Sequence, residues 1–274
     1  MARRLTVLKI GGSLIEDGSA AGGSGPALLD RVAAAWEAGE EILLVHGGGA
    51  ELGRWLERLG IGSRFVDGQR VTTKEALPVA LMVLGGLINR RLVEALLGRG
   101  CPAVGLTGAD GSGTRAAPDP RPGLGSVGRI VSVNAPFYRS LIAARRLPVV
   151  ASLSLGPEGG WLNVNADLMA GALAAGLGAR RLLMMTDVNG VRGGDGATLR
   201  TLTLPGLRRL IDSGTAREGM VPKLEACGVA LAARVPEVRI LGPDAAVLSR
   251  ALGNGAALDG PRGSGTRVLT EARP

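Results

Sequence analysis

The sequence predicts an α/β fold built around a mainly parallel sheet. Two apolar runs with strand character, at 5–8 and 42–45, are separated by a helical pattern, and a second helical pattern follows. Each run leads within two residues into glycines, at Gly11-Gly12 and Gly47-Gly48-Gly49. Alternating strands and helices are typical of parallel sheets, whose loops gather at the carboxyl ends of the strands. We therefore expect a ligand site at that edge of the sheet.

The composition fits one large domain or two closely packed lobes. A chain of 274 residues can bury a sizeable core, and 46% hydrophobic residues with a mean hydropathy of +0.24 argue against disorder. Aromatic residues make up only 2%, so aliphatic side chains must fill the core. The net charge of +8 could attract nucleic acid, but the arginines are scattered and stacking aromatic residues are few. We expect no nucleic-acid partner.

The positions of the cysteines, the histidine and the apolar stretches argue against a metalloprotein, a secreted protein and a membrane protein. Cys101 and Cys227 share no metal-binding spacing with each other or with His46, the only histidine, so we expect free buried thiols and no metal site. The first apolar run has about six residues, too few for a signal peptide. The apolar stretch 76–88 is too short for a membrane span of about 20 residues. We expect a soluble, cytoplasmic protein with no membrane partner.

Lysine is scarce, and its positions indicate phosphoryl chemistry. Among 32 Lys and Arg residues, lysine occurs only at Lys9, Lys74 and Lys223. A compact ammonium on a flexible stem suits a moving phosphoryl group, whereas a guanidinium offers a rigid fork. Glycines such as Gly11 and Gly12 let the backbone approach a ligand closely. We interpret this strand end as an anion site; the alternative is a solvated lysine at a tight turn.

The next two helices flank the second strand. Pro26 opens and Gly39 ends a helical pattern, the usual asymmetry of helix ends. The strand over 42–45 leads through His46 into three glycines, whose successive N–H groups at the start of a helix over 51–59 form an anion-binding nest. We expect His46 to position this turn rather than to act as a general base.

A short hairpin and a long helix follow. Residues 65–68 predict the hairpin, which leaves Arg70 in a loop near the end of the sheet. The pattern over 74–97 carries large aliphatic residues at three- and four-residue spacing, which is typical of a core or a dimer face. Pro78 is expected in the first turn of this helix or at a kink.

Asn163, Asn165 and Asp167 form the most informative polar segment. They alternate, so in an extended segment their side chains share one face. A helical pattern begins at Leu168, which predicts that Asp167 is the helix N-cap. Because a cap does not need two further asparagines, we expect the segment to bind a ligand.

The remaining elements complete the sheet. Strands are expected at 103–106, 129–133, 148–153, 181–185, 238–241 and 267–269, helices at 135–145, 168–177, 207–211 and from 223 onward, and a loop or irregular hairpin at 112–127. A polar turn occupies 186–191. We place a soft boundary near residue 175, which divides the chain into 1–175 and 176–274.

In their order and spacing these motifs resemble those of the amino acid kinase family over nearly the whole chain. The matching segments are Lys9-Ile10-Gly11-Gly12, His46-Gly47-Gly48-Gly49, 68–72, 108–111, 163–167, 186–191, 219–223 and Gly265-Thr266. The resemblance implies a three-layer αβα sandwich with a mainly parallel open sheet and two closely packed lobes. Lobe 1–175 would bind an acyl amino acid and dimerise, and lobe 176–274 would bind ATP.

The resemblance also implies an activity and a set of site residues. The activity is ATP-dependent phosphorylation of the side-chain carboxylate of N-acetyl-L-glutamate, in arginine biosynthesis. The implied catalytic residues are Lys9, Lys223 and Asp167; the substrate residues are Gly47, Gly48, Arg70 and Asn163; and the nucleotide residues are Gly11, Gly12, Thr186, Asp187 and Gly190. Mg²⁺ would be carried mainly by the phosphates. A carboxylate is already ionised at neutral pH, so this chemistry needs no general base.

Some positions depart from the family pattern, and two other functions stay open. Gln69 stands where the family usually has a leucine before the substrate arginine. Thr73 replaces an acidic residue, Leu87 replaces a lysine and Arg129 replaces a glutamate. The alternatives are a kinase of carrier-protein-linked aminoadipate in lysine biosynthesis and a non-catalytic ligand-binding regulator on the same fold. Arginine-inhibited members carry an extra N-terminal helix, whereas the first strand here begins at Leu5, so we expect an arginine-insensitive homodimer.

Overall fold

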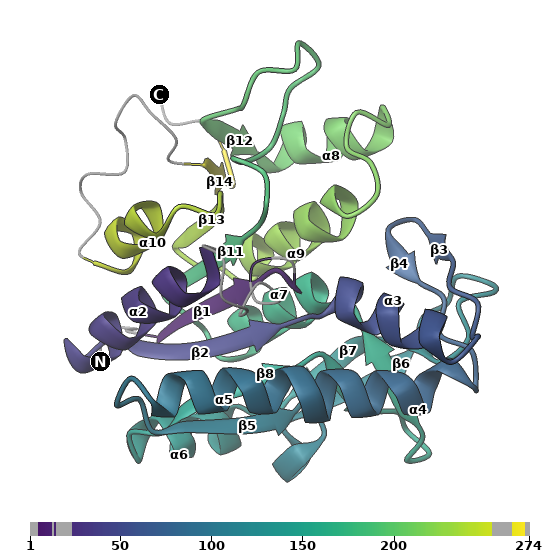
Figure 1. The fold of residues 1–274 in the computed structure, drawn as a ribbon. Coiled ribbons are helices and arrows are strands. Elements are labelled where there is room, and N and C mark those ends of the chain that lie inside the picture. The colour runs from purple at the N-terminus through teal and green to yellow at the C-terminus, as the bar shows by residue number, and fades with distance from the viewer. Residues whose placement is uncertain (1–4, 13, 15–23, 254–264, 272–274) are drawn as a thin grey trace.

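The computed structural model describes residues 5–12, 14, 24–253 and 265–271, and its centre is an eight-stranded sheet (Figure 1). The strand order is β12-β14-β13-β11-β1-β2-β8-β5. Six neighbouring strands are parallel, whereas β14 runs antiparallel to β13 and parallel to β12. The strands are β1 (Leu5–Ile10), β2 (Glu41–His46), β5 (Ala103–Thr107), β8 (Leu147–Ala151), β11 (Arg181–Met185), β12 (Thr201–Thr203), β13 (Glu237–Leu241) and β14 (Thr266–Leu269).

Helices cover both faces of this sheet and produce the expected three layers (Figure 1). One face is covered by α2 (Ser24–Glu37), α3 (Gly49–Arg58), α4 (Ala76–Ala80), η1 (Leu81–Ile88), α5 (Asn89–Leu97) and α10 (Ala245–Leu252). The other face is covered by α6 (Ala135–Ala143), α7 (Ala166–Gly176), α8 (Leu204–Asp212) and α9 (Met220–Ala232). The fold class predicted from the sequence is therefore confirmed.

The alternation of side chains along β1 determines which face carries its lysine. Leu8 and Ile10 belong to the hydrophobic cluster beneath α2 and α5, whereas Val7 belongs to the cluster beneath α7 and α9. Because successive side chains of a strand point to opposite faces, Lys9 lies on the same face as Val7. Lys9 therefore reaches the layer of α7 and α9 at the carboxyl end of its strand.

A second, smaller sheet differs from the sequence-based prediction. Strands β6 (Thr114–Pro118), β7 (Val127–Val133), β9 (Leu153–Leu155) and β10 (Trp161–Val164) form a closed four-stranded arrangement, and η2 (Asp110–Ser112) is a short 3₁₀ turn before it. The segment expected as a loop or irregular hairpin therefore contains β6. The single strand expected over 148–153 is wrong, because the chain leaves the main sheet at Ser152 and continues as β9.

The long helical run Ala76–Leu97 packs on the core. Its 22 residues are long and apolar enough to cross a membrane by length and composition, so the apolar segment is longer than the expected 76–88. Leu84, Ile88 and Leu92 are buried in the cluster on the α2 face of the sheet, as in the core helix of a folded domain. Pro78 lies within the first turn of α4, where its missing N–H costs no helical hydrogen bond.

Candidate active site

A cavity of about 210 Å³ lies at the carboxyl ends of β1, β2 and β8, beneath the hairpin of β3 (Phe65–Val66) and β4 (Gln69–Arg70). Its lining includes seven of the site residues expected from the sequence, namely Lys9, Gly12, Gly47, Gly48, Arg70, Asn163 and Asp167. The helices α3 and α7 begin at this cavity, at Gly49 and Ala166. Because helix N-termini present unpaired N–H groups, the cavity is suited to an anion.

Two ammonium groups meet on one carboxylate at the floor of this site. Lys9 Nζ lies 2.9 Å from Asp167 Oδ1, and Lys223 Nζ lies 2.9 Å from Asp167 Oδ2. Lys223 comes from the first turns of α9, and all three residues are buried. With both lysines protonated, the cluster carries one excess positive charge beside the cavity. An anionic group bound there would neutralise that charge.

Burial and mutual attraction set the protonation of this cluster. Burial alone would raise the pKa of Asp167, but the ammonium groups of Lys9 and Lys223 outweigh it and lower that pKa to about 2. Burial lowers the pKa of Lys9, against the attraction of Asp167 and with the repulsion of Lys223. Asp167 is therefore ionised at neutral pH and acts as an anchor for both lysines rather than as a proton donor.

The helix cap at this point differs from the prediction. Asn165 is the N-cap of α7, and its side chain accepts hydrogen bonds from the backbone N–H groups of Asp167 and Leu168. Asp167 thus lies inside the first helical turn. Since an asparagine satisfies the cap, the Asp167 carboxylate is available to the two lysines.

His46 supports the glycine turn as a neutral side chain. Burial lowers its pKa to about 4, against a hydrogen bond to the Gly47 carbonyl, so the imidazole is uncharged at neutral pH. Its Nδ1 donates to the Gly47 carbonyl oxygen at 2.9 Å, and its Nε2 accepts from the Asn89 side chain at 3.0 Å. The role expected from the sequence, positioning of the turn, agrees with these contacts.

Arg70, from the hairpin, and Asn163, from β10, both line the cavity. Arg70 Nη2 donates to the Gly49 carbonyl oxygen at 2.6 Å, and its guanidinium stacks 4.6 Å from the centre of the Phe65 ring. Asn163 donates to the hydroxyl of Thr72 at 3.0 Å. Thr72 was not singled out as a separate site residue, because its partner lies 91 residues away in the chain.

The residues expected to bind the nucleotide gather at the end of β11. Gly11 donates its N–H to the Met185 carbonyl at 3.2 Å, so the turn after β1 lies beside the start of 186–191. The hydroxyl of Thr186 donates to Asp187 at 3.0 Å. Gly190 adopts φ +113°, and a Cβ there would lie 2.7 Å from the Thr266 hydroxyl, so only glycine fits this turn. These residues form a second group beside the lysine cluster.

The described side chains offer no obvious metal centre. Within the part of the chain that the structure describes, no three His, Cys, Asp or Glu side chains are close enough together to hold a metal ion. This donor set does not fit a metal held by the protein itself. Both cysteines are free and buried, as expected.

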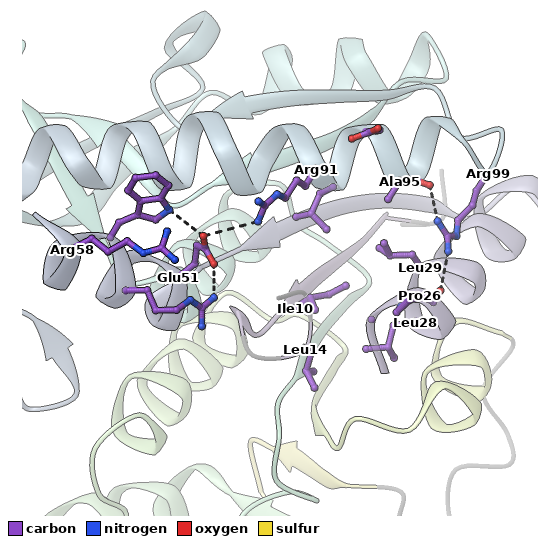
Figure 2. A pocket seen from close by; sticks show the side chains of 15 residues that line it. Ile10, Leu14, Pro26, Leu28, Leu29, Glu51, Arg58, Arg91, Ala95 and Arg99 are labelled. Atoms are coloured by element: carbon purple, nitrogen blue, oxygen red, sulfur yellow. Dashed lines mark hydrogen bonds and ion pairs between the residues drawn. The ribbon is translucent and has the colours of Figure 1, made fainter. Parts of the chain in front are cut away.

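A larger cavity, of about 800 Å³, lies on the opposite face, between α2, α3 and α5 (Figure 2). Ile10 lines it, whereas Lys9 points to the other face of β1. Among its lining residues, Glu51 accepts a hydrogen bond from Trp55 at 3.0 Å and pairs with Arg54, whereas Arg99 pairs with Asp30 outside the lining. This cavity is separate from the lysine cluster.

Comparisons with known proteins agree on one family. The model of the Amino acid kinase family matches residues 4–242. An acetylglutamate kinase of Geobacillus kaustophilus (strain HTA426) is 41% identical over 238 residues, 87% of this chain and 90% of that protein. An acetylglutamate kinase of Koribacter versatilis (strain Ellin345) is 46% identical over 236 residues, 86% and 89% of the two chains. The crystal structure of smu.665 from Streptococcus mutans UA159 superposes with a TM-score of 0.81 at 28% identity, covering 97% of this chain and 99% of that one.

Proposed function

The chain belongs to the amino acid kinase family, and on this basis we propose that it transfers the γ-phosphoryl group of ATP to the side-chain carboxylate of N-acetyl-L-glutamate. One observation carries the proposal. Two of the three lysines in the chain, from opposite ends of the sequence, meet on a single buried carboxylate beside a glycine-lined cavity.

The proposed reaction uses the charges at this site without moving a proton. A carboxylate oxygen of the acceptor attacks the γ-phosphorus, a new O–P bond forms, and the bond to the β-phosphate oxygen breaks to release ADP. Lys9 and Lys223 stabilise the negative charge on the transferring group, and Asp167 holds both ammonium groups in place. The product is an acyl phosphate, which we assign to arginine biosynthesis.

We assign the acyl amino acid to the cavity beneath the hairpin. The N–H groups of Gly47 and Gly48, at the start of α3, bind the reacting carboxylate. Arg70 and Asn163 hold the α-carboxylate and acetamido end, because both line the cavity near the hairpin. Lys9 then lies beside both the acceptor carboxylate and the transferring phosphoryl group.

We assign ATP to the residues at the end of β11, namely Gly11, Thr186, Asp187 and Gly190, and to Gly12, which lines the neighbouring cavity beside Lys9. Lys9 and Lys223 are then the protein side chains that bind its phosphates. Mg²⁺ would be carried mainly by the phosphates, whose charge it would help to neutralise. Residues 1–175 act as the acceptor-binding and dimerising lobe, and residues 176–274 act as the nucleotide-binding lobe.

We also propose a cytoplasmic homodimer that arginine does not inhibit. The apolar residues Met82 and Leu97 are exposed on the long helical run, whereas Val83, Leu84, Ile88, Leu92 and Leu96 are buried in the core, and this exposed surface is our candidate for the dimer face. A paired surface of this kind leaves the cavity at the ends of β1 and β2 accessible.

Release of ADP tests the proposed reaction directly. The purified protein is incubated with MgATP and either N-acetyl-L-glutamate or N-acetyl-L-glutamine, which lacks the side-chain carboxylate. We expect ADP release only with the former, and we expect hydroxylamine to trap the acyl phosphate as a hydroxamate. Faster turnover of a carrier-linked aminoadipate would assign the protein to lysine biosynthesis instead. Ligand binding without ADP release from any carboxylate acceptor would favour a non-catalytic regulator.

A further inference from the structure

Gln69 is a buried carboxamide without a partner beside the candidate acceptor cavity. It lies in β4, is 2% exposed and lines the same cavity as Lys9 and Gly48. Neither its Nε2 nor its Oε1 has a hydrogen-bond partner among the residues that the structure describes, and both atoms are shielded from solvent. Buried polar groups are almost always paired, so a carboxamide with both ends unsatisfied needs an explanation.

Unlike Gln69, its neighbours Arg70 and Asn163 have hydrogen-bond partners. Arg70, the next residue, donates to the Gly49 carbonyl and packs against Phe65. Asn163, across the cavity lining, donates to Thr72. The hairpin around Gln69 is therefore ordered by specific contacts, and the unpaired amide is confined to this one side chain on the cavity side of the site.

We propose that Gln69 is a specificity residue that recognises the acylamino group of the acceptor. Its Oε1 accepts the amide N–H of the acylated amino acid, and its Nε2 donates to an adjacent oxygen of the same substrate. This inference rests on the proposed kinase function, and it adds a residue that selects an amide-bearing acceptor over a plain dicarboxylate.

The chemistry of a carboxamide is what selects this ligand class. Gln69 presents an acceptor oxygen and an NH₂ group with two N–H donors, so a ligand must bring both a donor and an acceptor to satisfy it. Lys9 and Arg70 supply only donors, so the substrate N–H must pair with an acceptor in the lining, such as Gln69 Oε1. A dicarboxylate brings acceptors alone and would leave Gln69 Oε1 unpaired, which is costly in a buried site. An acylated amino acid has its N–H next to carboxylate and carbonyl oxygens.

The test compares N-acetyl-L-glutamate with its ester isostere, (S)-2-acetoxyglutarate, which has oxygen in place of the amide N–H. We expect the wild-type kcat/KM to favour the amide by about tenfold or more, since a lost hydrogen bond leaves the buried acceptor unpaired. In Gln69→Leu the preference should fall to within about threefold, because the apolar side chain cannot distinguish N–H from oxygen.

A matched control and a second measurement separate recognition from folding. Tyr138→Phe also removes a buried, unpartnered polar group, but Tyr138 lies in α6 and does not line the cavity, so the amide preference should persist. Without ligand, Gln69→Leu should melt no lower than the wild type, because the uncompensated carboxamide is gone. The rise in melting temperature caused by N-acetyl-L-glutamate should be smaller in Gln69→Leu than in the wild type.

The outcomes distinguish this inference from the proposed function. If the wild type phosphorylates N-acetyl-L-glutamate and Gln69→Leu keeps the same amide-to-ester ratio, the role of Gln69 is wrong and the kinase function stands. If no ADP is released but calorimetry shows that the amide preference in binding depends on Gln69, the kinase function is wrong and the recognition role stands. Failure of the wild type to bind either acceptor overturns both.

Discussion

At the scale of single residues, the site depends on where two ammonium groups lie rather than on their charge alone. Lys9 and Lys223 each lie within 3 Å of the Asp167 carboxylate. Arginine would keep the positive charge, but its planar guanidinium is larger and is fixed as a fork, so it would not place a compact charge on the transferring phosphoryl group.

Lys9→Arg and Lys223→Arg are therefore expected to lower kcat on the order of a hundredfold each, as the loss of one transition-state contact does. Steady-state kinetics and thermal melting measure the effects on rate and on folding. Lys74→Arg is the matched control, because the third lysine is exposed and should tolerate the change. Turnover at the wild-type rate in both site variants would mean that the lysines were misassigned.

Asp167→Asn tests the carboxylate as an anchor. The variant leaves two buried ammonium groups without their counter-ion, so we expect a loss of about 3–5 kcal/mol in the free energy of unfolding at pH 7. The folded-state pKa of Asp167 is about 2, below the ordinary aspartate value of 3.8, so the wild type loses this contribution as pH falls from about 4 towards 2.

Urea titrations from pH 7 to pH 3 would measure this dependence. The stability difference between wild type and Asp167→Asn should narrow in the acid part of the range, because protonated Asp167 also lacks the charge. A difference that stays constant with pH would argue that the aspartate stabilises the fold by packing rather than by charge.

The sequence drew attention to Lys9 and Lys223 because lysine is scarce and both lie in glycine-containing segments, and to Asp167 because it alternates with two asparagines before a helical pattern. It could not identify the cap of α7, because Asn165 and Asp167 are both good caps and only the geometry of the turn decides between them. Partners that are distant in sequence, such as Thr72 for Asn163, leave no local pattern. Gln69 was visible as a departure, but its unpaired state required the fold.

At the scale of elements, the start of α3 depends on the absence of one side chain. Gly48 is the N-cap of α3, and a Cβ at this position would lie 2.0 Å from Ile88 Cδ1 and 2.9 Å from Leu84 Cδ2. The glycine therefore lets η1 pack directly against the turn that we assign to the acceptor carboxylate.

Gly48→Ala is expected to cost about 1–3 kcal/mol through overpacking and to raise the KM for the acceptor, because α3 must move away from η1. Chemical denaturation and steady-state kinetics measure the two effects. Gly62→Ala serves as the control, since nothing lies within 4 Å of its added methyl group. Equal KM values for the wild type and Gly48→Ala would remove this turn from the acceptor site.

Strands that are continuous apolar runs were predicted well, whereas strands whose pairing partners are distant in the sequence were not. The strands β1, β2 and β11 are continuous apolar runs buried on both faces, which is the signal of a parallel sheet. The small sheet containing β6 and β9 pairs segments about 40 residues apart, and no local pattern encodes that pairing. The helix α10 was missed although Asp244 caps it, a signal that could have revealed it.

At the scale of the whole molecule, both halves of the chain share one sheet. β1 lies between β2, from the first half, and β11, from the second half. Each hydrophobic cluster also draws on both halves, so the clusters divide by face of the sheet rather than by position in the sequence. The candidate site lies where the halves adjoin, which allows acceptor and nucleotide groups to meet at Lys9.

The proposed dimer is also tested at this scale. Static light scattering should give twice the 27.8 kDa mass of the chain, and Met82→Asp should shift it towards a single chain by placing a charge in the apolar face. Exposed Val131 lies on β7, away from the long helix, so Val131→Asp is the control. A stable hexamer, or strong inhibition of ADP release by arginine, would contradict the proposal.

The contact between the hairpin and α9 joins the two proposed lobes across the site. Gly68, at φ +73°, would place a Cβ 2.3 Å from the Glu218 carbonyl oxygen, immediately before α9 begins. Gly68→Ala should therefore hold the hairpin away from α9 and lower kcat/KM for both substrates by about tenfold or more, because small displacements of reacting groups are costly. Gly60→Ala is the matched control: Gly60 has φ +67° but no atom within 4 Å, so it carries the backbone strain alone. Equal losses of kcat/KM in the two variants would mean that backbone strain, and not the loss of contact between the hairpin and α9, accounts for the effect.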